Sequence, residues 1–478
     1  MTDAMQRLAE LQRRDLPVHG GRTLAYVYDS GDPEVDRVAR DAVAAYAASN
    51  ALDPTAFPSL LQMENELVGF ACGLLEAPAS AVGTVTSGGT ESILLAVQGA
   101  RDSRPDVARP RMVLPATAHA AFHKAGHYFG VEVVLVPVGP DFRADAAAMA
   151  EAIDDDTVLV VASAPSYAHG VVDPVTEIAA AASARGIRCH VDACIGGWVL
   201  PYAARLGRAV PAWTFAVEGV TSISVDTHKY AYAPKGTSLL LHRDAALRKP
   251  QFFASAAWPG YTMLNATTQS TRSGGPVAGT WAVVEHLGDD GYLALAERAL
   301  AAVDAIVACI EREPSLRLAV QPDSTLVTLT TDASCDTFTL TDELVSRGWY
   351  VQPQLSFDGG VPSIHLSVSA GTLAHVEDFA SALADSVAAA QAAGPVAVDP
   401  GVVAFIESLD PAALDDDEFD GLLAASGLAG ASADGELELP GRMAEVNAML
   451  DLASPAMREA LLVAFLDRLQ RPVRRDRA

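Results

Sequence analysis

Short runs of β-branched and aliphatic residues alternate along this chain with alanine-rich stretches of helical length. Residues 157–163, 187–193 and 222–226 have the composition of buried strands, and residues 176–185 have that of a helix, followed by Gly186 as a stop signal. Neighbouring parallel strands require a crossover connection, which is usually a helix. The alternation therefore predicts an α/β fold built around a mostly parallel sheet.

The same patterns predict the remaining elements. Further strands are expected at residues 111–114, 131–138 and 238–243, and further helices at residues 90–102 and 118–129. Beyond Gly291, a long helix at residues 292–312 leads to strands at 326–330 and 364–368 and helices at 340–347 and 375–393. Helical periodicity returns at residues 443–469. A second set of strands and helices after the first predicts a smaller C-terminal α+β domain.

Four regions follow from these patterns. We predict an N-terminal arm at residues 1–60, a large domain at 61–295, a small domain at 296–393, and an acidic linker with a helical extension at 394–478. Residues 396–440 carry eleven carboxylates and no lysine or arginine, which is typical of a solvated segment. We therefore expect the part of the chain between residues 394 and 440 to be a linker.

The charge balance and the cysteines limit the class of partner. The 33 basic and 60 acidic side chains give a net charge of −27, which argues against a nucleic acid or an anionic membrane as partner. The sequence lacks a charge-free run of 18 apolar residues and a signal-peptide core. Its five cysteines are an odd number and lack metal-ligand spacing, so we expect free thiols in a reducing compartment rather than disulfides. We expect a cytoplasmic protein with no membrane insertion.

Three groups with distinct chemistry follow one another in the predicted large domain. The run Ser87-Gly88-Gly89-Thr90 opens a helix, Asp192 ends one strand, and Lys229 lies just beyond another. In open α/β sheets, ligands bind at the carboxyl ends of the strands. An anion-binding helix start, a carboxylate and an amine nucleophile are what pyridoxal 5'-phosphate (PLP) needs for its phosphate, its ring nitrogen and its Schiff base. The order predicts a PLP site, in which desolvation should depress the pKa of Lys229.

Two further residues have less specific signals. His119 precedes a predicted helix at a strand end, where a histidine can stack on a pyridine ring, although a lone histidine there is more often a helix cap. Lys235 lies in an Ala-Pro-Lys-Gly turn and suits a substrate anion as well as it suits solvent. His123 and His127 follow His119 at helical spacing, but no third ligand type joins them, so we expect no metal.

Three stretches resemble the group II PLP-dependent decarboxylase superfamily, and within it the sphingosine-1-phosphate lyase branch. They are Gly83–Ser92, His190–Gly197 and Ser222–Gly236, and the resemblance extends from about residue 20 to about residue 390. It implies a type I PLP-dependent transferase fold. It also implies a homodimer in which the neighbouring subunit completes each active site.

The resemblance also assigns roles to individual residues. It implies that Lys229 holds PLP, that Asp192 meets the ring nitrogen, and that His119 stacks on the ring, while Ala193 is small enough for the ring to pack against the backbone. The residues implied around the phosphate are Ser87, Gly88, Gly89, Thr90, His228 and Gly274. Those implied at the substrate are Tyr28, with Tyr26 close to it in the alignment, Lys235 and Arg272.

One residue departs from the lyase pattern. Asp53, in Asn50-Ala51-Leu52-Asp53-Pro54, stands where the eukaryotic lyases have a histidine. A carboxylate beside a substrate phosphate would repel it, so this position favours an unphosphorylated substrate.

The expected function is a carbon-carbon lyase that cleaves a β-hydroxy amine, phosphorylated or not, by retro-aldol chemistry through an external aldimine. Tyr28 or His119 would take the proton of the substrate hydroxyl. An amino-acid decarboxylase is the alternative, because both reactions form the same kind of carbanion on the same PLP cradle. A non-catalytic scaffold with the PLP fold is a further alternative, which the intact Lys229 and Asp192 disfavour.

Overall fold

The computed structural model describes residues 3–425, 441–470 and 472, which fall into two compact units. The first unit comprises Met1–Ala308, Val320–Thr328 and Leu366–Val376. The second comprises Cys309–Ala319, Leu329–His365 and Glu377–Ala478. Every residue of the candidate site lies in the first unit, so the site is described within that unit alone.

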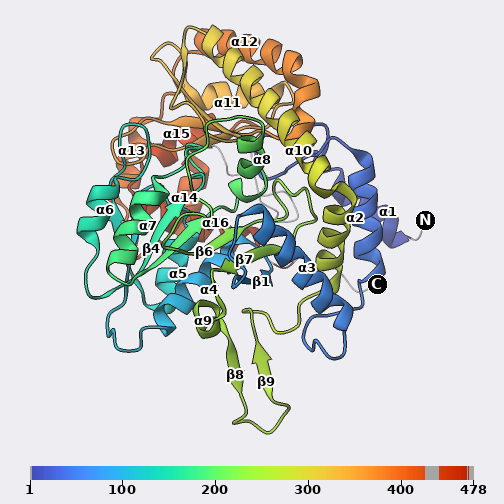
Figure 1. Cartoon of the computed structure of the whole chain (residues 1–478). Helices are drawn as coiled ribbons and strands as arrows, with labels where there is room; N and C mark the ends of the chain where they lie inside the picture. The colour runs from blue at the N-terminus through green and yellow to red at the C-terminus, as the bar shows by residue number, and fades with distance from the viewer. Residues whose placement is uncertain (1–2, 426–440, 471, 473–478) are drawn as a thin grey trace. The chain divides into compact units, whose positions relative to one another are not determined.

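A seven-stranded sheet in the order β1-β7-β6-β5-β4-β2-β3 forms the centre of the first unit (Figure 1). Its strands are β1 (Val82–Thr86), β2 (Arg111–Pro115), β3 (Glu132–Val136), β4 (Thr157–Ser163), β5 (Arg188–Asp192), β6 (Val220–Val225) and β7 (Ser238–His242). The pairs from β6 through to β3 are parallel, whereas β7 runs antiparallel to both β1 and β6. The predicted α/β fold with a mostly parallel sheet is confirmed.

Helices contact both faces of this sheet. The α-helices that lie wholly within the first unit are α1 (Asp3–Gln12), α2 (Pro33–Ala45), α3 (Pro58–Leu74), α4 (Gly89–Asp102), α5 (Ala121–Phe129), α6 (Ala146–Ala152), α7 (Val175–Ala184), α8 (Leu200–Arg205) and α9 (Ala245–Arg248). α4 and α5 share one apolar cluster with side chains of β2 and β4, while α3 and α7 belong to a larger cluster on the other face. A two-stranded hairpin, β8 (Phe253–Ser255) and β9 (Met263–Asn265), projects from this unit (Figure 1).

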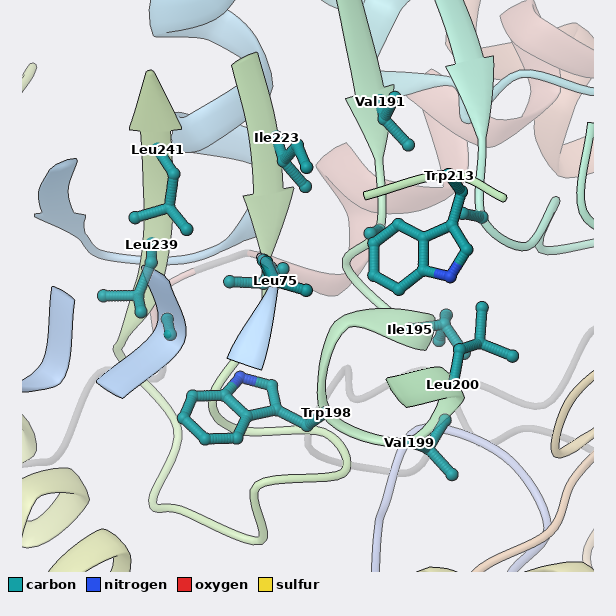
Figure 2. Close-up of a cluster of buried hydrophobic side chains, with 14 of the residues drawn as sticks. Leu75, Val191, Ile195, Trp198, Val199, Leu200, Trp213, Ile223, Leu239 and Leu241 are labelled. Carbon is teal, nitrogen blue, oxygen red and sulfur yellow. The ribbon is translucent and has the colours of Figure 1, made fainter. Parts of the chain in front are cut away.

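Successive side chains of a strand point to opposite faces, and the larger cluster takes one set of them. Figure 2 shows Val191, Ile223, Leu239 and Leu241 on this face, and Trp198 belongs to the same cluster. All five side chains are at most 2% exposed. Burying an aliphatic side chain of this size contributes about 1.5–3 kcal/mol, so this face supplies much of the stability of the sheet.

A long helix, α10 (Gly274–Arg312), begins earlier than predicted. Gly288 interrupts its helical geometry with a φ of 55°. The two glycines and the proline at its start have low helix propensity, which is why the pattern at residues 292–312 was the only part recognised as helix.

A second, four-stranded sheet has the order β10-β11-β13-β12. Its strands are β10 (Leu316–Leu318), β11 (Leu326–Thr331), β12 (Gln352–Gln354) and β13 (Ser363–Ser367), and the helices that follow them in sequence are α11 (Thr337–Ser346) and α12 (Val376–Ala393). The elements predicted here lie within three residues of these bounds. The prediction that this region combines a separate sheet with helices, as an α+β structure, is therefore confirmed.

The last part of the chain differs from the predicted linker. Residues 400–425 contain α13 (Pro400–Ser408) and α14 (Asp416–Ala425), and α15 (Ala444–Leu452) and α16 (Pro455–Leu469) follow. Side chains from all four helices form one apolar cluster, among them Ile406, Phe419, Met449 and Leu461. The many carboxylates between residues 396 and 440 make the helical spacing of the apolar residues difficult to recognise in the sequence. The rest of the acidic segment, residues 426–440, lies outside the described residues. No described helix has the length and apolarity needed to cross a bilayer.

Candidate active site

A cavity of about 420 Å³ lies at the carboxyl ends of β4, β5 and β6, beside the start of α4. It is lined by Ser87, Gly88, Gly89, Thr90, Glu91, Ile93, His119, Ser163, Pro165, Tyr167, Asp192, Cys194, Ile195, Asp226, His228 and Lys229. The structure therefore brings together the helix start, the carboxylate, the histidine and the lysine that the sequence predicted as one site.

Lys229 forms an ion pair inside this cavity. Its Nζ lies 2.9 Å from Oδ2 of Asp226, and the two side chains are 17% and 3% exposed. Burial lowers the pKa of Lys229, but the negative charge of Asp226 outweighs it and holds that pKa above its usual value. The prediction of a depressed lysine pKa is therefore wrong, because the sequence does not reveal that Asp226, only three residues earlier, is the ion-pair partner of Lys229. The proton on Lys229 has to leave before the amine can act as a nucleophile.

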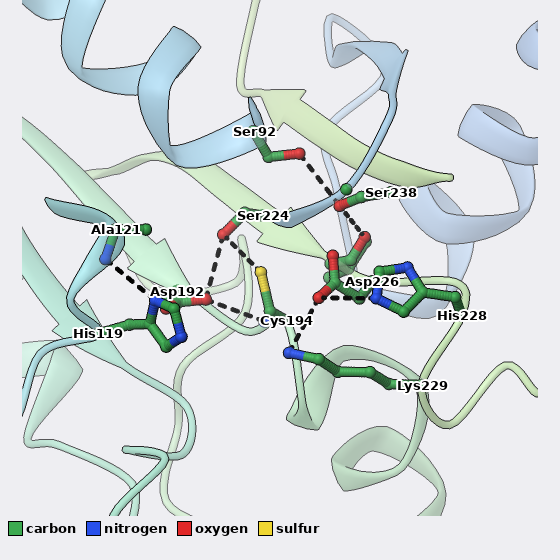
Figure 3. A network of polar contacts seen from close by, with 12 residues as sticks. Ser92, His119, Ala121, Asp192, Cys194, Ser224, Asp226, His228, Lys229 and Ser238 are labelled. Atoms are coloured by element: carbon green, nitrogen blue, oxygen red, sulfur yellow. Dashed lines mark hydrogen bonds and ion pairs between the residues drawn. The ribbon is translucent and has the colours of Figure 1, made fainter. Parts of the chain in front are cut away.

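Asp192 has one carboxylate oxygen in use and one available. Its Oδ1 accepts hydrogen bonds from the backbone N–H of Cys194 at 3.1 Å and from the hydroxyl of Ser224 at 3.3 Å (Figure 3). Among the described residues, none donates to Oδ2, and the residue lines the cavity while being only 7% exposed. This carboxylate oxygen can still accept a hydrogen bond at the cavity, and the N–H of a protonated pyridine ring would supply the donor.

The start of α4 is organised by a glutamate that the sequence analysis missed. Oε2 of Glu91 accepts from the backbone N–H of Ser87 at 2.6 Å, and Oε1 accepts from the N–H of Thr268 at 2.9 Å. A glutamate at the third helical position commonly reaches back to the N-cap N–H, which is the signal that could have identified Glu91, although here it accepts from Ser87, one residue before the N-cap Gly88. The N–H groups of Gly88, Gly89 and Thr90 have no acceptor within the described part of the chain, so they are open to an anion such as the PLP phosphate.

Gly89 is needed for a steric reason. A Cβ atom at this position would lie 2.8 Å from both carboxylate oxygens of Asp226 and 2.8 Å from Sγ of Cys194. The backbone of the anion-binding helix start can therefore approach the Lys229–Asp226 pair only because residue 89 lacks a side chain.

The two histidines at the cavity have fixed orientations. Nδ1 of His119 accepts from the N–H of Ala121 at 3.1 Å, which leaves the ring proton on Nε2 (Figure 3). Its ring meets that of Tyr167 edge-on, with the centroids 6.3 Å apart. His119 is exposed, so its ring is available to cover a bound pyridine. Nδ1 of His228 lies 2.8 Å from the carbonyl oxygen of Thr237, to which it donates.

Tyr28 and Lys235 lie near this cavity without lining it. Nζ of Lys235 lies 5.2 Å from the centroid of the Tyr28 ring and donates to the carbonyl oxygen of Tyr26 at 3.1 Å. Burial raises the pKa of Tyr28, and the charge of Lys229 opposes this rise. Desolvation and the charge of Lys229 lower the pKa of Lys235 to about 8. The Tyr26 side chain is 56% exposed, so Tyr28 is the tyrosine placed beside the lysines.

Four further predicted residues, Asp53, Arg272, Gly274 and Ala193, do not line the cavity. Asp53 is exposed, and its Oδ1 accepts from the N–H and the hydroxyl of Thr55 at 2.8 and 2.6 Å. Arg272 pairs with Glu64 at 2.7 Å, and the N–H of Gly274 donates to the carbonyl oxygen of Ser49 at 2.8 Å. Their roles at phosphate or substrate stay predictions. Ala193 is fully buried and donates its N–H to the carbonyl oxygen of Ser224.

Comparison with known families identifies the protein class. The model described as the pyridoxal-dependent decarboxylase conserved domain matches residues 30–331. The chain belongs to the pyridoxal-dependent decarboxylase family. A second model, described as the C-terminal putative HTH domain of pyridoxal-dependent enzymes, matches residues 400–468, which include α13 to α16.

Individual relatives narrow the branch. The chain is 37% identical to sphingosine-1-phosphate lyase of Dictyostelium discoideum, over 75% of this chain and 67% of the relative. It is 30% identical to a probable L-aspartate decarboxylase of Pyrococcus furiosus, over 73% of this chain and 91% of the relative. The solved structure of Burkholderia pseudomallei sphingosine-1-phosphate lyase matches with a TM-score of 0.77 and 34% identity, over 82% of this chain and 91% of that one.

These similarities confirm the predicted family and its sphingosine-1-phosphate lyase branch. The chain is a PLP-dependent lyase with the type I fold. The residues at the cavity fit the cofactor, because a free Oδ2 on Asp192, unsatisfied N–H groups at α4 and the amine of Lys229 match the ring nitrogen, phosphate and aldehyde of PLP.

Proposed function

We propose that this lyase cleaves the Cα–Cβ bond of a phosphorylated β-hydroxy amine of the sphingoid-base class. The similarity to sphingosine-1-phosphate lyases over at least two thirds of each chain is the observation that carries the proposal. The position of Tyr28 and Lys235 beside the cavity supports it, since a cation and a hydroxyl next to Lys229 suit a substrate with an anion and a hydroxyl.

The residues of the site divide the work between them. PLP, when bound, supplies the electron sink for the bond that breaks. Asp192 keeps a proton on the ring nitrogen, and His119 covers the ring. Lys235 carries a positive charge at neutral pH because its pKa is about 8, so it can pair with the substrate phosphate.

Tyr28 and His119 orient the substrate as donors. The raised pKa of Tyr28 keeps its hydroxyl protonated at neutral pH, and His119 carries its proton on Nε2 because Nδ1 is occupied by Ala121. Each can therefore donate a hydrogen bond to a substrate oxygen. The Tyr28→Phe variant, which lacks the phenol hydroxyl, tests the predicted role of Tyr28 as base for the hydroxyl proton, and an unchanged kcat would contradict that role.

Product analysis tests the proposed reaction. The purified protein with PLP is incubated with a sphingoid base 1-phosphate, and the long-chain aldehyde and phosphoethanolamine are measured by mass spectrometry. We expect both products in equal amounts, and none with the Lys229→Ala variant, whose fold is checked by circular dichroism because Asp226 loses its partner. Absence of aldehyde from folded, PLP-loaded wild-type protein would contradict the proposal.

A decarboxylase is the second candidate, favoured by the similarity to the probable L-aspartate decarboxylase over 91% of that relative. The same assay discriminates between the two reactions. Carbon dioxide and an amine released from L-aspartate or another amino acid, without aldehyde from the sphingoid phosphate, would establish the second candidate.

We also propose that the chain works as a homodimer with shared sites. The hairpin β8–β9 and its turn expose large apolar side chains, with Phe253 54%, Tyr261 58% and Leu264 66% exposed. Exposed apolar patches of this kind are usually covered by a partner, and a second copy would cover them here. A monomeric mass in light scattering at micromolar concentration would contradict this.

The five free cysteines support the proposed cytoplasmic location.

A further inference from the structure

A line of polar side chains runs along β5 and β6 and ends at Asp192. The register pairs His190 with Ser222 and Asp192 with Ser224, and the two-residue period of a strand places all four side chains on one face. Nδ1 of His190 lies 2.9 Å from Oγ of Ser222, and Nε2 lies 3.1 Å from Oγ of Ser224. The hydroxyl of Ser224 reaches Oδ1 of Asp192 at 3.3 Å (Figure 3). All four side chains are buried.

The direction of each hydrogen bond in this line is determined. A carboxylate only accepts, so the hydroxyl of Ser224 donates its proton to Asp192. Oγ of Ser224 then accepts from Nε2 of His190 and from the thiol of Cys194, which lies 3.4 Å away. Nδ1 of His190 is left without a proton and accepts from the hydroxyl of Ser222.

A neutral His190 is required for this arrangement. Burial lowers the pKa of His190 to about 4, so at neutral pH the ring carries one N–H, as the chain of bonds demands. Ser222 therefore donates to His190, His190 donates to Ser224, and Ser224 donates to Asp192, so all three hydrogen bonds run in the same direction. Hydrogen bonds aligned in this way polarise one another and strengthen the last one.

We propose that Ser222, His190 and Ser224 form a directed hydrogen-bond chain that stabilises the charged carboxylate of Asp192, and thereby holds the proton on the PLP ring nitrogen. The inference rests on the assignment of Asp192 to that nitrogen and extends the site from one residue to four. Ser222, His190 and Ser224 are positioning residues, because they act through Asp192 and line no part of the cavity.

Cofactor affinity, measured without any turnover, tests this chain. Apoprotein is titrated with PLP and with the analogue that has a carbon atom in place of the ring nitrogen. Only PLP can use the charge of Asp192, so the ratio of the two dissociation constants isolates the effect. We expect Ser224→Ala to weaken PLP binding about tenfold, one pKa unit of the Asp192 interaction, and to change binding of the analogue less than about twofold.

The other positions give a graded series and a matched control. Ser222→Ala, at the far end of the chain, should weaken PLP binding by only about twofold to threefold, since it acts through His190. Thr221 also joins the two strands, through hydrogen bonds with the backbone of Cys189 at 2.8 and 3.0 Å, but it does not lead to Asp192. Thr221→Val should therefore leave the ratio unchanged.

Two results would overturn the inference. One is an equal loss of affinity for PLP and the analogue in Ser224→Ala, which is what a merely structural serine would give. The other is unchanged PLP binding in that variant. If wild-type protein binds both ligands equally well, the assignment of Asp192 fails, whereas failure of the lyase reaction alone would leave all these ratios intact.

A measurement on the unmodified chain keeps the inference testable if Ser224→Ala does not fold. Nitrogen NMR of protein with ¹⁵N-labelled histidine reports which ring nitrogen of His190 carries the proton, with His190→Gln as the assignment control. We expect the proton on Nε2. A proton on Nδ1 would reverse the direction of the chain and contradict the proposal.

Discussion

The two faces of β5 and β6 differ in polarity, although their side chains come from alternating residues of the same two strands. On one face, Val191 and Ile223 lie in an apolar cluster and are fully buried. On the other, His190, Asp192 and Ser224 form hydrogen bonds that end at the cavity. Since adjacent residues alternate between the faces, stability and chemistry are assigned to neighbouring positions. A substitution should therefore affect either folding or turnover, depending on which face it changes.

The largest effect that separates the faces is expected for Asp192→Asn. The amide keeps the shape but not the negative charge that we propose holds the ring proton, so kcat should fall on the order of 10²-fold, about 3 kcal/mol of transition-state stabilisation. The melting temperature of the apoprotein should stay close to that of the wild type. Steady-state kinetics together with calorimetry check both parts, and wild-type turnover in the variant would contradict the role of Asp192.

Lys235 should give a pH-dependent effect on substrate binding. Its pKa of about 8 means that the ammonium is present below pH 8 and is lost as the pH rises through that value. The KM for a phosphorylated substrate should therefore rise about tenfold between pH 7 and pH 9, following the loss of the cation. Lys235→Arg keeps its charge over this range and should show a flat KM, and a flat profile in the wild type would count against Lys235 as the phosphate ligand.

The apolar face should respond in the opposite way to Ile223→Val. Removing one buried methylene group costs about 1 kcal/mol of unfolding free energy, and the polar side chains on the opposite face keep their contacts. Chemical denaturation should show this loss, while kcat of the folded protein stays within about twofold of the wild type. A larger effect on kcat than on stability would show that the two faces are not independent.

The smallest effect is expected at Asp53. Its carboxylate is exposed and bonded to Thr55, and these bonds hold its pKa below the usual value. An exposed charge interacts weakly, so Asp53→His should raise kcat/KM for a sphingoid phosphate by no more than about threefold. Asp53→Asn, which removes the charge alone, is the control. A loss of activity of both variants on an unphosphorylated β-hydroxy amine, without a loss on the phosphorylated one, would show that Asp53 serves the unphosphorylated substrate.

Much of the sheet could be predicted because its strands are continuous apolar runs between helical patterns. The direction of β7 could not, because Ser238-Leu239-Leu240-Leu241-His242 is as apolar as its parallel neighbours. A connection from residue 226 to residue 237 without a helix was the only sign of the antiparallel pairing.

The candidate site was predictable where one residue type has one chemical use. Lys229, Asp192 and the Gly88-Gly89 turn each follow or precede an element whose end could be located from the sequence. Asp226 and Glu91 were missed, because a carboxylate acts through the partner that the fold gives it. The predicted direction of the pKa shift of Lys229 is wrong for the same reason, since burial could be inferred from the sequence but the ion pair with Asp226 could not.

We expect PLP to bind in the cavity next to the polar face of β5 and β6, through a Schiff base with Lys229. The direct measurement is reduction of the purified protein with borohydride, followed by proteolysis and mass spectrometry of the cofactor-labelled peptide. We expect the label on Lys229, in the peptide that follows β6. A label on Lys235, or a folded protein that takes up no label in the presence of excess PLP, would contradict it.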